Sequence, residues 1–263
     1  MDLDDAFANA AYIPQADDYP PRWAKKAEAF RETMAQNHRA RLGVAYGNGP
    51  RQEMDIFLPE DSPKGLVVFV HGGYWLRFDR FSWSHLAAGP CAHGWAVAMP
   101  SYDLCPQVHI GDITGQVAHA VTLAAREVAG QVRLVGHSAG GQQVCRMGAD
   151  GVLPDAVARR VARIMPISPV ADLRPLRHTR MNEALALDAA EAELESPLLA
   201  TAPSAPVTVW VGADERPVFV EHATALAAAW NASLVVEPDR HHFDVIDALE
   251  NPESAMTSAL LQD

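Results

Sequence analysis

The stretch LVGHSAGGQ, at residues 134–142, carries the clearest chemical signal in the sequence. A short apolar run leads directly into GHSAG (residues 136–140), and a pattern typical of a helix follows. A G-x-S-x-G sequence between a strand and a helix holds its serine hydroxyl out on a sharp turn, where it can act as a nucleophile. We therefore predict Ser138 as the nucleophile, at a helix start that favours developing negative charge.

A serine nucleophile needs a base to take its proton and an acid to orient that base. In folds with this serine turn, the chain order is serine, acid, histidine. Asp214 comes directly after the apolar stretch VTVWVG, with Glu215 beside it. The pair His241 and His242 follows the last predicted strand. We predict Asp214 as the acid, with a helix N-cap as its alternative role, and one histidine of the pair as the base.

A glycine-rich turn in VFVHGGYW follows another apolar run. Such a turn can supply backbone N–H donors for the oxyanion of a tetrahedral intermediate, together with the residue after the nucleophile. The predicted donors are Gly72, Gly73, Tyr74 and Ala139. We expect His71 to hold the turn in place rather than to act as a base.

Apolar stretches alternate with helical patterns along most of the chain. Strands are predicted around residues 54–58, 65–70, 95–100, 132–136, 163–168, 207–212 and 233–238, the first of them half-buried and GLVVFV (65–70) central. Helices are predicted near residues 82–93, 112–129, 139–149 and 216–230. This alternation predicts an α/β fold with a mostly parallel central sheet and helices on both faces.

Residues 1–263 are predicted to form one domain with two additional segments. In residues 1–40, Trp23 and Met34 belong to an apolar stripe with helical spacing, which indicates a helix laid on the body of the fold or a cap over a pocket. Residues 172–202 contain helical pieces without a strand. We expect them to form a small helical cap insertion above the site, with structural padding as the alternative.

Composition limits the partners and the compartment. The formal net charge of −12 disfavours nucleic acid and anionic membranes, so we expect a small-molecule substrate. The sequence lacks a signal-peptide pattern and a bilayer-length apolar run, so a cytoplasmic location is predicted. The three cysteines lack metal-site spacing and are expected to be free thiols. The oligomeric state stays open between a monomer and a homodimer.

Three segments resemble a known family. HGGYW (71–75) has the H-G-G-x-W form of arylformamidases, or kynurenine formamidases, a hormone-sensitive-lipase-like branch of the α/β-hydrolase superfamily. ISPVADLRPL (167–176) looks like the segment after their sixth strand, except that Ala171 stands where a tyrosine is expected. HHFDVID (241–247) is similar to their catalytic-histidine segment, in which the histidine directly precedes phenylalanine. The resemblance therefore selects His242 as the base.

The resemblance implies an α/β-hydrolase fold and hydrolysis of N-formyl-L-kynurenine to kynurenine and formate in tryptophan breakdown. It implies no metal and no cofactor. Trp75, Tyr102 and Phe243 are candidate pocket residues, each with a core position as the alternative. Arg174 and Arg177 either meet a substrate carboxylate or lie on the surface. A general carboxylesterase and a non-catalytic ligand-binding protein are the alternative functions.

Overall fold

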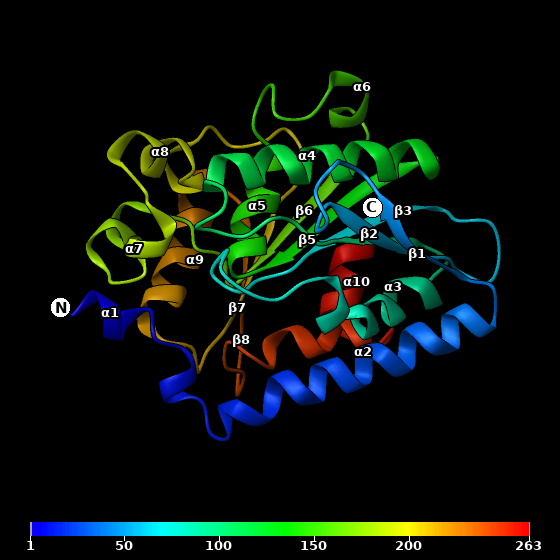
Figure 1. The fold of residues 1–263 in the computed structure, drawn as a ribbon, viewed down its shortest axis with the longest axis horizontal. Coiled ribbons are helices and arrows are strands. Elements are labelled where there is room, and N and C mark those ends of the chain that lie inside the picture. Colours follow the sequence, from blue (N-terminus) through cyan, green and yellow to red (C-terminus); the bar gives the residue numbers. More distant parts are fainter. Residues whose placement is uncertain (1, 263) are drawn as a thin grey trace.

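The computed structural model describes residues 2–262, which are built around a sheet of eight strands (Figure 1). The strands lie in the order β1-β2-β4-β3-β5-β6-β7-β8. β2 runs antiparallel to β1 and β4, and all other neighbouring pairs are parallel. The strands are β1 (Ala40–Ala45), β2 (Glu53–Phe57), β3 (Gly65–Val70), β4 (Ala96–Pro100), β5 (Gln131–His137), β6 (Val161–Ile167), β7 (Thr208–Gly212) and β8 (Ser233–Glu237).

Helices cover both faces of this sheet, as predicted (Figure 1). One face is covered by α4 (Ile110–Glu127) and α5 (Ala139–Met147), and α9 (Pro217–Trp230) continues this cover over β7. The opposite face is covered by α2 (Tyr19–Gln36), α3 (Ala88–Ala92) and α10 (Ala255–Leu261). The remaining α-helices are short: α1 (Leu3–Ala6), α6 (Asp155–Ala158), α7 (Asn182–Leu185) and α8 (Ala189–Leu194).

The central strand β3 shows why the sheet is buried on both faces. All six of its residues are buried. Leu66 and Val68 belong to the core beneath α4, whereas Val67 and Phe69 belong to the core beneath α2. Fully burying side chains of this kind contributes about 1.5–3 kcal/mol each, so the continuous apolar run stabilises both layers at once.

The structure departs from the predicted elements in three places. β1 was not expected. The strand at residues 53–57 is buried almost throughout rather than on one face, because Arg80 pairs with Asp55 at 3.0 Å and the ring of Phe30 packs on Phe57. The helix expected over 82–93 is instead two 3₁₀ turns followed by α3. Pro90 lies in the first turn of α3, where its missing N–H is tolerated, whereas a helix begun at residue 82 would need that N–H to donate to the Leu86 carbonyl.

The two additional segments have the helical character expected of them. α2 buries Trp23, Ala27 and Met34 against the sheet. Residues 172–202 lie between β6 and β7 and contain two short helices and two 3₁₀ turns, with no strand among them. Within residues 2–262, no helix is both long enough and apolar enough to cross a membrane.

Candidate active site

Ser138 occupies the sharp turn between β5 and α5. Its backbone has φ 55° and ψ −115°, a conformation that costs energy in a residue with a side chain. The glycines on either side let the turn close. A Cβ on Gly136 would lie 2.2 Å from the Gly140 carbonyl oxygen, and one on Gly140 would lie 2.0 Å from that of Val70. Larger residues would therefore force the strand and the helix apart.

A buried carboxylate lies against His242. Oε2 of Glu215 is 2.6 Å from His242 Nδ1, and the Glu215 side chain is fully buried. Its other oxygen, Oε1, accepts hydrogen bonds from Ser168 Oγ and from the Gly212 N–H, the latter at 2.8 Å. These donors satisfy the buried charge. Because Nδ1 faces the carboxylate, Nε2 is the imidazole nitrogen left to exchange a proton with another group.

The acid predicted from the sequence is wrong by one residue in this geometry. The carboxylate that meets His242 belongs to Glu215, whereas Asp214 is exposed. The N–H of Asp214 donates to the Arg240 carbonyl at 2.9 Å, which turns the chain after β7 and leaves the next side chain facing inward. The sequence places two adjacent acidic residues after an apolar strand. Which of the two side chains faces inward depends on the geometry of the turn, which the sequence alone does not give.

The structure separates the two histidines clearly. His241 lies 3.0 Å from the Tyr19 hydroxyl through Nε2, and its Nδ1 lies 3.1 Å from Asp244. His242 is buried against Glu215 and lines the same pocket as Ser138. His242 is therefore the residue of the pair that the structure brings to the nucleophile turn, as the resemblance implied.

A second ring, that of His137, packs 4.6 Å from the His242 ring and also lines the pocket. Burial, followed by the neighbouring charge of His242, lowers the pKa of His137 well below its ordinary value. His137 is thus held neutral. It can pack beside the candidate base without competing for a proton at neutral pH.

The HGGYW turn lies directly against Ser138. A Cβ on Gly72 would come within 3.1 Å of the Ser138 Cβ. His71 holds this turn, because its Nδ1–H donates to the Gly72 carbonyl at 2.7 Å and its ring stacks on Tyr102 at 4.2 Å. Burial lowers the pKa of His71 to about 4, so the ring stays neutral. These contacts agree with a positioning role for His71.

The backbone N–H groups of the four predicted oxyanion donors are available beside the nucleophile. Within residues 2–262, those of Gly72, Gly73, Tyr74 and Ala139 donate to no acceptor. The N-terminal arm, residues 2–18, holds Tyr74 in place. The Tyr74 hydroxyl donates to the Phe7 carbonyl at 2.7 Å and accepts from Asn9 Nδ2 at 2.8 Å. Preorganised, unpaired N–H groups of this kind can stabilise a developing oxyanion.

The pocket in front of Ser138 is small and mostly aromatic, with an open volume of about 300 Å³. It is lined by Trp23, Gly73, Tyr74, Arg77, Phe78, Trp83, His137, Ser138, His242 and Phe243. The Trp23 and Trp83 rings lie 5.2 Å apart, and Phe243 lies 5.3 Å from Trp23. α2 therefore contributes a wall of the pocket as well as covering the sheet.

The predicted pocket residues are only partly present in it. Phe243 lines the pocket, whereas Trp75 and Tyr102 are completely buried in the core beneath α4. The Trp75 indole donates to Gln142 at 3.2 Å, and the Tyr102 hydroxyl donates to the His71 carbonyl at 2.8 Å. Trp23, Phe78 and Trp83 were not predicted as pocket residues, because none of them adjoins a residue of the predicted catalytic machinery in the sequence.

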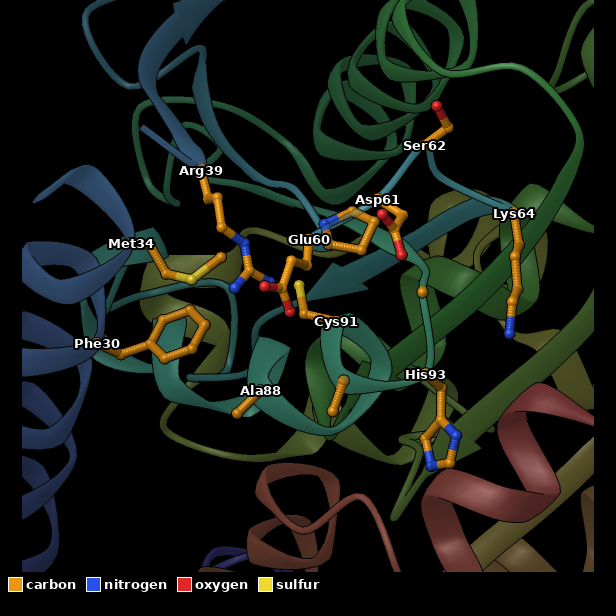
Figure 2. A pocket seen from close by; sticks show the side chains of 13 residues that line it. Phe30, Met34, Arg39, Glu60, Asp61, Ser62, Lys64, Ala88, Cys91 and His93 are labelled. Atoms are coloured by element: carbon orange, nitrogen blue, oxygen red, sulfur yellow. The ribbon is translucent and has the colours of Figure 1, made fainter. Parts of the chain in front are cut away.

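A larger hollow lies elsewhere, at the amino-terminal ends of β3 and β4 (Figure 2). Arg39, Glu60, Asp61 and Lys64 surround it, together with Phe30 of α2. It contains neither the nucleophile turn nor the buried carboxylate–imidazole pair. Size alone would select this hollow, but the chemistry selects the smaller one.

The small pocket thus brings together a hydroxyl, an imidazole oriented by a carboxylate, and unpaired N–H donors. Such a set can carry out nucleophilic acyl transfer. Within residues 2–262, no group of three or more His, Cys, Asp or Glu side chains is placed to hold a metal ion.

A family model described as "Serine hydrolase" matches residues 114–258, which include Ser138, Glu215 and His242. The chain belongs to the serine hydrolase family. The hydrolase is 26% identical over 240 residues to a kynurenine formamidase of Salmo salar, covering 84% of this chain and 81% of the relative. It is 30% identical over 214 residues to a kynurenine formamidase of Drosophila melanogaster, covering 77% and 67%.

Solved structures agree with this assignment. The hydrolase is similar to a putative thioesterase of Silicibacter sp. TM1040, with 53% identity over 100% of both chains and a TM-score of 0.97. An esterase of Pyrobaculum calidifontis shares the fold, with a TM-score of 0.70 and 18% identity over 95% of this chain and 94% of that one. The hydrolase has the α/β-hydrolase fold predicted from its sequence.

Proposed function

We propose that this hydrolase cleaves N-formyl-L-kynurenine to kynurenine and formate, with Ser138, His242 and Glu215 as its catalytic triad. The hydrogen bond between Glu215 and His242, 2.6 Å long and buried beside Ser138, carries the mechanistic part of the proposal. The aromatic walls of the pocket and the kynurenine formamidase relatives, which align over most of the chain, support an aryl formamide as substrate.

In the first half of the reaction, Ser138 Oγ attacks the formyl carbon while His242 Nε2 accepts the hydroxyl proton. Glu215 keeps the imidazole in the tautomer that carries its proton on Nδ1, and it stabilises the imidazolium that forms. The developing oxyanion accepts hydrogen bonds from Ala139 and from the 72–74 turn. Loss of one such donor typically costs about 3 kcal/mol of barrier stabilisation.

In the second half, His242 gives its proton to the anilide nitrogen, and the carbon–nitrogen bond breaks to release the aryl amine. Ser138 then carries the formyl group as an ester. Water attacks this ester with His242 as general base, formate leaves, and the proton returns to the serine oxygen. The aromatic rings that wall the pocket suit contact with an aryl leaving group.

Hydrolysis of short-chain esters or thioesters is the second candidate. The solved structure that shares 53% identity with this chain is described as a putative thioesterase, and the fold neighbours include esterases. All three reactions use the same nucleophile, base and oxyanion donors. Only the leaving group differs, so substrate preference decides between them.

The deciding experiment measures kcat/KM for N-formyl-L-kynurenine, 4-nitrophenyl acetate and an acetyl thioester, with wild type and with the Ser138→Ala variant. We expect the formamide to be the preferred substrate. We expect Ser138→Ala to lose at least about 10³-fold on all three. An ester or thioester preferred by the wild type would reject the named substrate and keep the triad.

A labelling experiment tests the nucleophile separately. A serine-directed fluorophosphonate should add one label to the wild type, at Ser138, and none to Ser138→Ala. Labelling of another residue would contradict the assignment of Ser138, whatever the substrate.

A further inference from the structure

The pocket in front of Ser138 contains an arginine without a carboxylate partner. Arg77 is the one permanently charged side chain among the ten residues that line it. Within residues 2–262, its guanidinium forms no ion pair, and it is exposed at the pocket. Its guanidinium carbon lies 5.0 Å from the ring centre of Phe78 and 6.0 Å from that of Tyr74. Both rings line the same pocket, so these contacts favour a position of the cation over the pocket.

Three other arginines of the loops and turns around the site have carboxylate partners within the protein, unlike Arg77. Arg80 pairs with Asp55 at 3.0 Å and with Glu53 at 2.6 Å. Arg174, which the sequence left open as a substrate contact, pairs with Asp172 at 2.8 Å. Arg216 pairs with Asp5 at 2.7 Å. Each of these has a carboxylate from the protein itself, whereas Arg77 is left for a carboxylate from outside.

Two further donors of this pocket are unsatisfied. The indole N–H groups of Trp23 and Trp83 are buried and donate to no acceptor within residues 2–262. Buried donors usually have a partner, because an unpaired one costs about 1–3 kcal/mol. Trp23 and Trp83 line the same pocket as Arg77, so a ligand that carries acceptor oxygens has N–H groups to pair with there.

The net negative charge of the hydrolase makes the unpaired Arg77 guanidinium more informative. The hydrolase has a net charge of −12, so its overall field repels an anionic substrate. An unpaired guanidinium at the catalytic pocket reverses that field locally. Its planar fork also matches the two oxygens of a carboxylate, which a simple ammonium group does not.

We propose that Arg77 binds a carboxylate on the leaving group of the substrate, so that the hydrolase prefers aryl substrates whose leaving group bears a carboxylate over matched substrates without one. The inference rests on the proposed function, because N-formyl-L-kynurenine carries an α-carboxylate on its aryl amine. Arg77 is a specificity-determining residue in this scheme, and the reacting formyl carbon lies at the other end of the substrate.

The test compares two matched substrate pairs. The first pair is N-formyl-L-kynurenine and its α-carboxamide, which differ only in the carboxylate. The second is 3-acetoxybenzoate and phenyl acetate, which replace the formamide by an ester. For each pair we take the ratio of kcat/KM for the substrate that bears the carboxylate to that for the substrate that lacks it. Arg77→Gln should lower this ratio about 10- to 100-fold, and Arg77→Lys should lower it less.

Arg174→Gln is the matched control, since it removes an exposed guanidinium that is already paired with Asp172. It should leave both ratios unchanged. Ratios unaffected by Arg77→Gln, or lowered equally by Arg174→Gln, would overturn the inference. If neither formamide is cleaved but the ester ratio still falls with Arg77→Gln, the formamidase proposal fails while the carboxylate site stands.

Discussion

The two hollows of this hydrolase differ in size and in chemistry. The larger hollow lacks the nucleophile turn, whereas the smaller hollow contains Ser138 and His242. The hollow at the amino-terminal ends of β3 and β4 has an open volume of about 1220 Å³, against about 300 Å³ in front of Ser138. The larger one is walled by side chains of α2 and α3 and of the loops that lead into β3 and β4 (Figure 2). The smaller one collects residues from the segments that follow β3, β5 and β8, together with Trp23 of α2.

The difference follows from strand direction. In a parallel sheet, the carboxyl ends of the strands meet at one edge, where the connecting loops lead into helix N-termini and their unpaired N–H groups. Ser138 and Ala139 use that geometry directly. At the opposite edge the chain only enters the strands, so the hollow there is lined by the side chains of helices and loops rather than by a strand-to-helix turn. The reactive end of the molecule is therefore identified by the strand ends that meet there, and not by the volume of the hollow.

The largest effect is expected from substitution of one of the two adjacent acidic residues after β7, Asp214 and Glu215. Glu215→Gln should lower kcat about 10²- to 10⁴-fold, because His242 loses the carboxylate that holds its tautomer and stabilises its charge. Asp214→Asn, one residue earlier and exposed, should stay within about threefold of wild type, as surface changes usually do. Steady-state kinetics on either proposed substrate measures both. The reverse order of effects would restore the acid predicted from the sequence.

A second effect concerns stability in acid. Burial lowers the pKa of His71 and of His222 to about 4, while in the unfolded chain each titrates near its ordinary value of about 6.5. The unfolded state therefore binds protons first as pH falls. The stability contributed by each neutral ring is complete above pH 6.5 and is lost as pH falls toward 4. The loss is at most about 1.4 kcal/mol per pH unit for each histidine.

The His222→Gln variant isolates one of these contributions. His222 Nδ1 accepts the Ala171 N–H at 3.2 Å, and protonation of that nitrogen would remove the acceptor. The unfolding free energy of the variant, followed by urea denaturation between pH 7 and pH 4.5, should fall less steeply than that of wild type. Parallel slopes would show that His222 is not held neutral in the folded state.

A third comparison uses one helix that reaches both hollows. Trp23 of α2 lines the catalytic pocket, and Phe30, two turns later, lines the larger hollow. Trp23→Leu should raise KM for an aryl substrate about tenfold, since an aromatic contact is lost from the pocket wall. Phe30→Leu also removes a ring from α2, and its KM should stay close to wild type. Equal changes in KM would mean that α2 acts by its overall position.

The smallest effect is expected at the larger hollow itself. Lys64 is exposed on its wall. Lys64→Ala should change kcat/KM less than twofold and the free energy of unfolding by no more than about 0.5 kcal/mol. A tenfold loss of activity would show that the amino-terminal edge communicates with the reactive one.

Local patterns predicted much of this molecule. The apolar run of β3 and the GHSAG turn each contain their structural reason within a few residues, so the sheet and Ser138 could be read directly. The choice between Asp214 and Glu215 depends on how the turn after β7 is held by the Arg240 carbonyl. Trp23 and Trp83 are separated from Ser138 by more than 50 residues, and only tertiary packing brings them to the pocket.

The bonds between the N-terminal arm and Tyr74 have a practical consequence. The Phe7 carbonyl and the Asn9 side chain fasten the turn that faces Ser138, and Asp5 binds Arg216, next to Glu215. Immobilising the hydrolase on a support through its first residues would pull directly on the reactive loops. Attachment through α10, which takes no part in these bonds, would avoid that direct pull.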